Sequence, residues 1–204
     1  MEMFLKLEDL FESIKNFRYF VTKIETPFFN DKFPKEYPIG RDVDIICHKE
    51  DFPKIVQISD ELIHAETNYS KHVIHDSDNQ TRFRIQTPRY YVRLNPMPYD
   101  KLINGHPMTK LYFQVDISTI DEKDFRVFKK DFLDSLFTDF SNRNGVKVLK
   151  PRAEAALRMM FWKNSPKSTH HLDYISENVS LEMLQNIQDQ EFKIWCENIL
   201  ERIL

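Results

Sequence analysis

Glycine and cysteine are scarce in this chain, and it has neither long apolar runs nor a large excess of one charge. Its three glycines, Gly40, Gly105 and Gly145, exclude both GxGxxG and GxxxxGKS/T phosphate-binding loops. Its two cysteines, Cys47 and Cys196, form no CxxC motif or disulfide framework, which favours a reducing, cytoplasmic setting. No apolar stretch approaches the ~20 residues that span a bilayer, so we expect no membrane span.

The composition is nevertheless that of a folded protein. Hydrophobic residues make up 41% and aromatic residues 13% of the 204 positions, which supports a packed core. That length fits one domain, or a core with a helical appendage. Lys and Arg number 29 against 32 Asp and Glu, a net charge of -3. Nucleic acid is therefore not favoured as a partner.

Hydrophobic periodicity predicts strands in the first part of the chain and helices in the second. β-Branched, aromatic or alternating runs predict strands over 19–24, 42–47, 71–75, 81–86, 89–94 and 110–118. Apolar residues at helical spacing predict helices over 3–17, 51–66, 124–142, 153–163, 170–178 and 180–203. The chain is thus predicted to be strand-rich to about residue 118 and helical afterwards. The fold class is therefore α+β, with a core over residues 1–150 and a C-terminal helical region over 151–204.

The most specific local pattern is an Asp-x-Asp at the start of the strand predicted over 42–47. Alternate side chains of a strand share a face, so Asp42 and Asp44 project together, about 7 Å apart at Cα. Val43 and Ile45 point the other way, into a core. Two carboxylates placed so closely repel each other unless a cation lies between them. Carboxylate oxygens of this kind suit Mg²⁺, which also binds substrate phosphates and waters.

A second strand supplies another carboxylate. In the strand predicted over 110–118, Asp116 lies between Val115 and Ile117 but on the opposite face from them. An acid flanked by apolar residues is costly in a core and unusual on a solvated surface. If this strand neighbours 42–47, three carboxylates converge, as two-metal nucleotidyl transfer requires.

The residues around these acids resemble the nucleotidyltransferase fold typified by DNA polymerase β and the minimal nucleotidyltransferases. The stretch YPIGRDVDIICHKEDF, followed by FQVDIS and VKVLKPRAEAALRMMFWK, is similar to bacterial members associated with surface-polysaccharide biosynthesis, over residues 19–165. The resemblance implies a mixed-sheet core in which Asp42, Asp44 and Asp116 are catalytic and bind Mg²⁺ or Mn²⁺. It also implies that Asp116 helps to deprotonate the acceptor hydroxyl, and that the substrate is a nucleoside triphosphate, ATP or CTP.

The chain lacks the Gly-Ser with which that family holds the triphosphate. Gly40 and Arg41 directly precede Asp42, and Arg41 or the basic strands would have to stand in. We therefore assign Gly40, Arg41, Arg89 and Lys150 as candidate nucleotide-binding residues. Lys150 is included because it precedes a predicted helix, where basic groups can meet phosphates.

The expected activity is transfer of NMP from the triphosphate to an acceptor hydroxyl or phosphate, with release of pyrophosphate. The near-neutral charge favours a small-molecule acceptor over RNA, while the oligomeric state stays open.

Two alternatives to this interpretation remain. The same fold could be a catalytically degenerate binding module, because the triphosphate motif is missing. A metal-dependent glycosyltransferase also uses Asp-x-Asp, but there the apolar strand precedes the motif, whereas here it follows. Separately, two interpretations stay open for the basic stretch that contains Arg82, Arg84, Arg89 and Arg93. It could form a wall for nucleotide phosphates or simply pair with acids on a solvated strand face.

Overall fold

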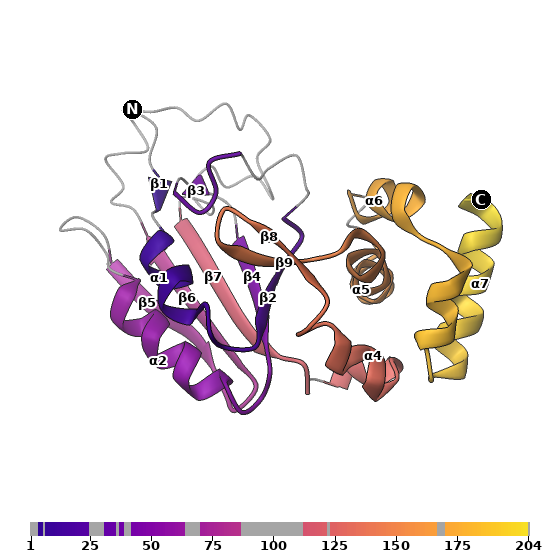
Figure 1. Ribbon diagram of the computed structural model, residues 1–204, viewed down its shortest axis with the longest axis horizontal. Coiled ribbons are helices and arrows are strands. Elements are labelled where there is room, and N and C mark those ends of the chain that lie inside the picture. The colour runs from indigo at the N-terminus through magenta and orange to yellow at the C-terminus, as the bar shows by residue number, and fades with distance from the viewer. Residues whose placement is uncertain are drawn as a thin grey trace.

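The protein has an α+β fold in which a mixed sheet is followed by C-terminal helices (Figure 1). The computed structural model describes residues 4–5, 7–24, 31–35, 37–38, 42–63, 70–86, 112–121, 123–166 and 170–203. The predicted fold class is confirmed. The predicted strand over 89–94 lies outside the described residues.

Among the described residues, seven strands form one sheet in the order β5-β6-β7-β4-β2-β9-β8. Their bounds are β2 (Tyr19–Thr22), β4 (Asp42–Cys47), β5 (Ser70–Asp76), β6 (Gln80–Gln86), β7 (Tyr112–Thr119), β8 (Phe140–Arg143) and β9 (Val146–Leu149). The pairs β4–β7 and β2–β9 are parallel, and the other neighbours are antiparallel. A separate pair joins β1 (Phe4–Leu5) to β3 (Tyr37–Pro38).

Two N-terminal helices lie on one face of this sheet, and the C-terminal helices lie beyond its β8–β9 end and against part of the opposite face (Figure 1). The α-helices are α1 (Glu8–Ile14), α2 (Phe52–Leu62), α4 (Lys130–Ser135), α5 (Pro151–Asn164), α6 (His170–Asn178) and α7 (Gln190–Ile203). Two 3-10 helices, η2 (Lys123–Val127) and η3 (Leu181–Asn186), complete the described elements. The division at residues 150 and 151 stays a prediction; β9 ends at Leu149 and α5 begins at Pro151.

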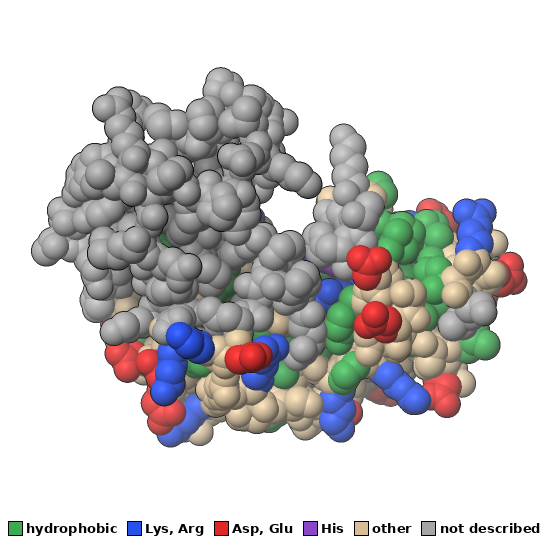
Figure 2. Space-filling model, turned by 90° about the horizontal axis from the view of Figure 1, so that it is seen from above, with side chains coloured by type: hydrophobic (Ala, Val, Ile, Leu, Met, Phe, Trp, Pro, Cys, Tyr) green, Lys and Arg blue, Asp and Glu red, His purple; other side chains and the backbone are tan. Residues whose placement is uncertain are grey.

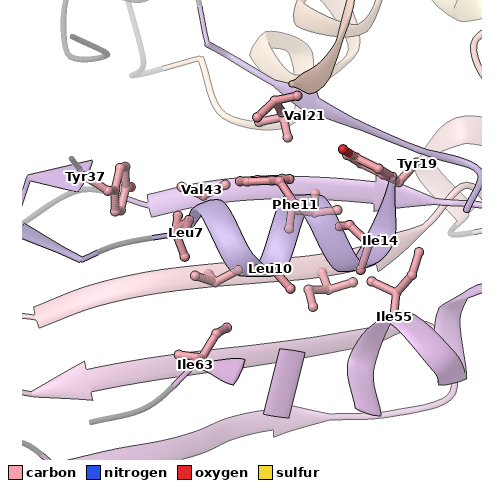
Figure 3. Packing of buried hydrophobic residues seen from close by; sticks show 14 of the residues in the cluster. Leu7, Leu10, Phe11, Ile14, Tyr19, Val21, Tyr37, Val43, Ile55 and Ile63 are labelled. Atoms are coloured by element: carbon pink, nitrogen blue, oxygen red, sulfur yellow. The ribbon is translucent and has the colours of Figure 1, made fainter. Parts of the chain in front are cut away.

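The sheet turns a continuous apolar face toward α1 and α2. Val43 and Ile45 of β4 are fully buried there, and Phe11 of α1 and Ile55 of α2 pack into the same cluster (Figure 3). These strand residues alternate with Asp42 and Asp44, as the period of two requires. The expected inward direction of Val43 and Ile45 is therefore confirmed.

The opposite face of the sheet is divided between apolar and polar residues. Phe20 of β2 and Ile46 of β4 belong to a second buried cluster that is built mainly from the C-terminal helices, including Leu157 of α5 and Phe192 of α7. Toward the other end of β4, that face carries polar side chains in place of apolar ones, beginning with Asp44. A sheet face that is half apolar and half polar leaves a polar surface beside a helical wall.

The described part of the surface carries both signs of charge. In Figure 2, Lys and Arg side chains lie interspersed with Asp and Glu over the coloured residues. None of the helices within the described ranges has both the length and the apolar character that a bilayer crossing requires.

The prediction of a single helix over 124–142 is wrong. That segment forms η2 and the short helix α4 and then enters the β8–β9 hairpin, so strands continue past residue 118. Asn144 and Gly145 form the turn with positive φ of 51° and 87°. An Asn-Gly pair is a strong hairpin signal because both residues tolerate this backbone region. The helix predicted over 180–203 is likewise interrupted, since η3 and α7 are separate elements.

An ion pair ties the start of β2 to the start of α2. Arg18 donates to Asp51 through its backbone N–H at 2.9 Å and its Nε at 2.8 Å, and it reaches the exposed Glu50 at 2.7 Å. The Asp51 side chain is 18% exposed, against 73% for Glu50. Hydrogen bonds from Arg18 hold the pKa of Asp51 below its ordinary value.

We expect Asp51→Asn to lower the free energy of unfolding by about 1 kcal/mol at pH 7, because it loses a charge-assisted contact with Arg18. A depressed folded-state pKa stabilises the fold above the ordinary pKa of 3.8. The difference from wild type should therefore shrink as the pH falls below that value. Urea unfolding at pH 7 and pH 3 measures both effects, with Glu50→Gln as the exposed control that should change little.

Candidate functional site

Three predicted site residues lie on one face of the sheet. In the parallel pair β4–β7, Asp44 is the register partner of Asp116, and Asp42 is the partner of Gln114. Because register partners and alternate residues share a face, all three carboxylates project from the polar face. Adjacent strands lie about 4.8 Å apart, so Asp44 and Asp116 are close neighbours.

Asp44 is paired with a lysine from the end of β2. Lys23 Nζ donates to Asp44 Oδ2 at 2.9 Å and lies 5.0 Å from the centroid of the Phe161 ring of α5. Burial lowers the pKa of Lys23, but the charges of Asp44, Asp42 and Glu154 more than offset this, so the pKa lies above its ordinary value. The ammonium therefore stays charged at neutral pH.

Lys23 has an unusual backbone that the surrounding structure holds in place. Its φ of 62° lies in the left-handed region, which costs a non-glycine residue roughly 1–2 kcal/mol. Its backbone N–H donates to Glu154 Oε1 of α5 at 2.7 Å. Strained residues persist where neighbours over-determine them, and they concentrate at functional sites.

Asp116 is paired with an arginine from β6. Arg82 is its antiparallel register partner, and Arg82 donates from Nε to Oδ1 at 2.7 Å and from Nη2 to Oδ2 at 2.9 Å. Gln114 Nε2 adds a third donor to Oδ2 at 3.1 Å, and Arg84 in turn donates to Gln114 Oε1 at 2.9 Å. Arg82, Gln114 and Arg84 come from two neighbouring strands and together fix the position of the Asp116 carboxylate.

Burial and the neighbouring carboxylates act on the pKa of Asp116 in one direction, and Arg82 acts in the other. Its side chain is 10% exposed, and burial raises the pKa of the carboxyl above its ordinary value, although the hydrogen bond from Arg82 opposes this. The charges of Asp44 and Asp42 raise the pKa of Asp116 further. The hydrogen bond to Asp116, joined by the charges of Asp42 and Asp44, raises the pKa of Arg82. The three acids and Arg82 thus form one electrostatic unit.

A buried ion pair on α5 supports the Lys23 backbone. Arg158 Nε donates to Glu154 Oε1 at 2.7 Å, and the two side chains are 1% and 5% exposed. The same Glu154 oxygen accepts the Lys23 N–H. Burial raises the pKa of Glu154, and the positive charge of Arg158 opposes that rise. Docking of α5 and the position of Lys23 therefore depend on one carboxylate.

The side chains fit a single hard cation better than two. Carboxylate oxygens are the donors that Mg²⁺ or Mn²⁺ takes, and one or two of them are enough beside phosphates and waters. Asp42 is exposed and Asp44 makes a single-point contact with Lys23, so both suit such an ion. Asp116 does not suit it in this arrangement, because three donors engage its two oxygens. Over the described ranges, no group of three His, Cys, Asp or Glu side chains is arranged around a metal position.

Of the other predicted site residues, only Lys150 lies within the described part of the chain, and it is not brought to these carboxylates. Gly40, Arg41 and Arg89 lie outside the described residues. Lys150 pairs with Asp139 just before β8, and both line a cavity of about 870 Å³ between α4, α5 and η3. The structure therefore gives Lys150 an exposed partner away from the polar sheet face.

Sequence analysis missed Lys23 and Glu154. Lys23 stands inside the run predicted as a strand over 19–24, where a lysine carries no signal of its own. Glu154 stands in a helix beside Arg158 at the i,i+4 spacing typical of exposed helical pairs, so its burial was not visible. For Arg82 the sequence left two alternatives, and the structure pairs it with an acid.

Comparisons with known proteins found remote similarity of structure. No protein-family model matches the chain, and no curated protein matches it significantly. An antigenic nucleotidyltransferase-like protein from Paracoccidioides brasiliensis is 11% identical over 98% of this chain and 91% of its own, with a TM-score of 0.43. The JHP933 protein from Helicobacter pylori is 10% identical over 97% and 88%, with a TM-score of 0.34. At these TM-scores, function has to be inferred from the side chains of the polar face.

We expect Arg158→Met to destabilise the protein by about 3–5 kcal/mol, because it leaves the buried Glu154 charge without its partner. Arg152→Met on the same helix is the matched control, since Arg152 pairs with Glu182 and both side chains are 73% exposed. That control should cost less than about 1 kcal/mol. Urea unfolding of the three proteins compares them, and equal losses in both variants would contradict a supporting role for the buried pair.

Proposed function

We propose that the polar face of the sheet binds a nucleoside triphosphate, ATP or CTP, together with Mg²⁺ or Mn²⁺. The protein then transfers the NMP to a small-molecule acceptor and releases pyrophosphate. The observation that supports this is the register of β4 and β7, which places Asp42, Asp44 and Asp116 on one face with Lys23 and Arg82. A metal–triphosphate carries both signs of charge, so it complements a face that presents both acids and bases.

In this proposal the side chains have separate roles. Asp42 and Asp44 hold the cation, which when bound neutralises charge on the triphosphate and activates the acceptor hydroxyl. Lys23 leaves Asp44 and donates to a phosphate oxygen, which its flexible four-carbon side chain allows. Asp116 keeps Arg82 and Gln114 in place, so a guanidinium faces the ligand. Gly40 and Arg41 stay proposed phosphate ligands.

A second candidate function is a nucleotide-binding module without turnover. The specific observation in its favour is that Asp44 and Asp116 are each neutralised by a basic side chain of the chain itself. The scarcity of glycine also excludes the glycine-rich loops that cradle phosphates. The two candidates share the ligand and differ in whether the acceptor reacts.

We expect Asp44→Asn to reduce NMP transfer by on the order of 100-fold or more, because it removes a carboxylate that stabilises the metal–triphosphate charge. Asp60→Asn is the control, since Asp60 pairs with Lys71 on the exposed side of α2. Pyrophosphate release with a panel of small-molecule acceptors measures transfer. Equal rates for wild type and Asp44→Asn would reject the transferase proposal, while binding of the triphosphate without release would favour the binding module.

Lys23→Met should weaken binding of a Mg²⁺–triphosphate roughly tenfold, because it removes one charge-assisted contact worth about 1.4 kcal/mol. Lys71→Met is the matched control, since Lys71 pairs with Asp60 instead of a site carboxylate. Calorimetric titration with a non-hydrolysable triphosphate measures both affinities. If Lys23→Met binds the triphosphate as tightly as wild type, Lys23 only balances the charge of Asp44 and does not contact the ligand.

A further inference from the structure

Two of the carboxylates on the polar face are neutralised in different ways. Asp116 accepts two parallel hydrogen bonds from Arg82, at 2.7 and 2.9 Å, from the position directly opposite on β6. A planar guanidinium that engages both oxygens of a carboxylate is among the strongest side-chain ion pairs. Asp44 instead accepts a single hydrogen bond from the ammonium of Lys23.

A second pair of side chains on the same strands, Arg84 and Gln114, holds the Arg82–Asp116 pair in place. Gln114 Nε2 donates to Asp116 Oδ2 at 3.1 Å, and Arg84 donates from Nε at 3.3 Å and Nη2 at 2.9 Å to Gln114 Oε1. Arg84 and Gln114 are register partners, as Arg82 and Asp116 are. Release of Asp116 would therefore break its hydrogen bonds from both Arg82 and Gln114.

The surroundings of Asp44 allow its carboxylate to be released. Its side chain is 23% exposed against 10% for Asp116, and Asp42 beside it is exposed. Lys23 has a flexible stem that can turn toward another anion. Asp42 and Asp44 can accordingly bind a cation without loss of the β6–β7 network.

A permanent positive charge occupies the position beside Asp116. An arginine guanidinium is not deprotonated in proteins, and here it lies within hydrogen-bond distance of both carboxylate oxygens. A divalent ion that approached the same oxygens would be repelled by that charge. The negative charge of Asp116 is thus already balanced by Arg82 before any ligand binds.

We propose that Arg82 takes the place of a second metal ion at Asp116, so the polar face binds one divalent cation, at Asp42 and Asp44. This inference rests on the proposed binding of a metal–triphosphate to this face. It assigns Arg82 a ligand-binding role: its guanidinium supplies a fixed positive charge to the ligand phosphates, independent of the metal concentration.

The test counts Mn²⁺ ions per chain by electron paramagnetic resonance, at saturating non-hydrolysable triphosphate. Arg82→Met should bind one Mn²⁺ more than wild type, because Asp116 becomes available, and Arg82→Lys should bind fewer than Arg82→Met because it keeps a charge there. Arg84→Met is the matched control from the same strand face and should bind the same number as wild type. No gain in Arg82→Met, or an equal gain in Arg84→Met, would overturn the proposal.

A variant that keeps Arg82 covers the case in which Arg82→Met does not fold. Asp116→Asn should bind the same number of Mn²⁺ ions as wild type, because the ion is held by Asp42 and Asp44. Loss of one ion would show that Asp116 is a metal ligand and would overturn the inference. If wild type binds no Mn²⁺, the proposed function is rejected. The role of Arg82 is tested separately, by the difference in Mn²⁺ count between the variant and wild type.

Discussion

Parallel pairing of β4 with β7 is the constraint on which the rest of this structure depends. Its register sets Asp44 beside Asp116, and the alternation along each strand then sends Val43 and Val115 into the core against α1 and α2. A shift by one residue would bury the acids and expose the apolar side chains. The core therefore enforces the register, and the register forces like charges together on the opposite face.

The repulsion between these carboxylates has to be balanced by cations that other elements deliver. Arg82 comes from the neighbouring strand β6, and Lys23 comes from the end of β2 on the other side. Lys23 depends in turn on Glu154 of α5, which accepts its backbone N–H and pairs with Arg158. The charge balance of the sheet face is thus coupled to docking of the C-terminal helices.

A ligand suited to this face has to satisfy acids and bases at once. A purely anionic ligand would be repelled by Asp42 and Asp44, and a simple cation would be repelled by Lys23 and Arg82. A metal–triphosphate offers positive charge to the first group and phosphate oxygens to the second. The strength of the two ion pairs also differs, so ligand binding can open one pair while the other stays closed.

The sequence by itself determined the α+β class, the strand at 42–47 and the face shared by Asp42 and Asp44, because strand periodicity depends on residues two apart. Only the tertiary structure decided what balances those acids. Lys23 lies 21 residues from Asp44, and Arg82 lies 34 residues from Asp116, so their pairing follows from strand order and register. Local patterns do not contain that information, since a lysine or arginine in a strand has the same appearance whether its partner is water or a buried carboxylate.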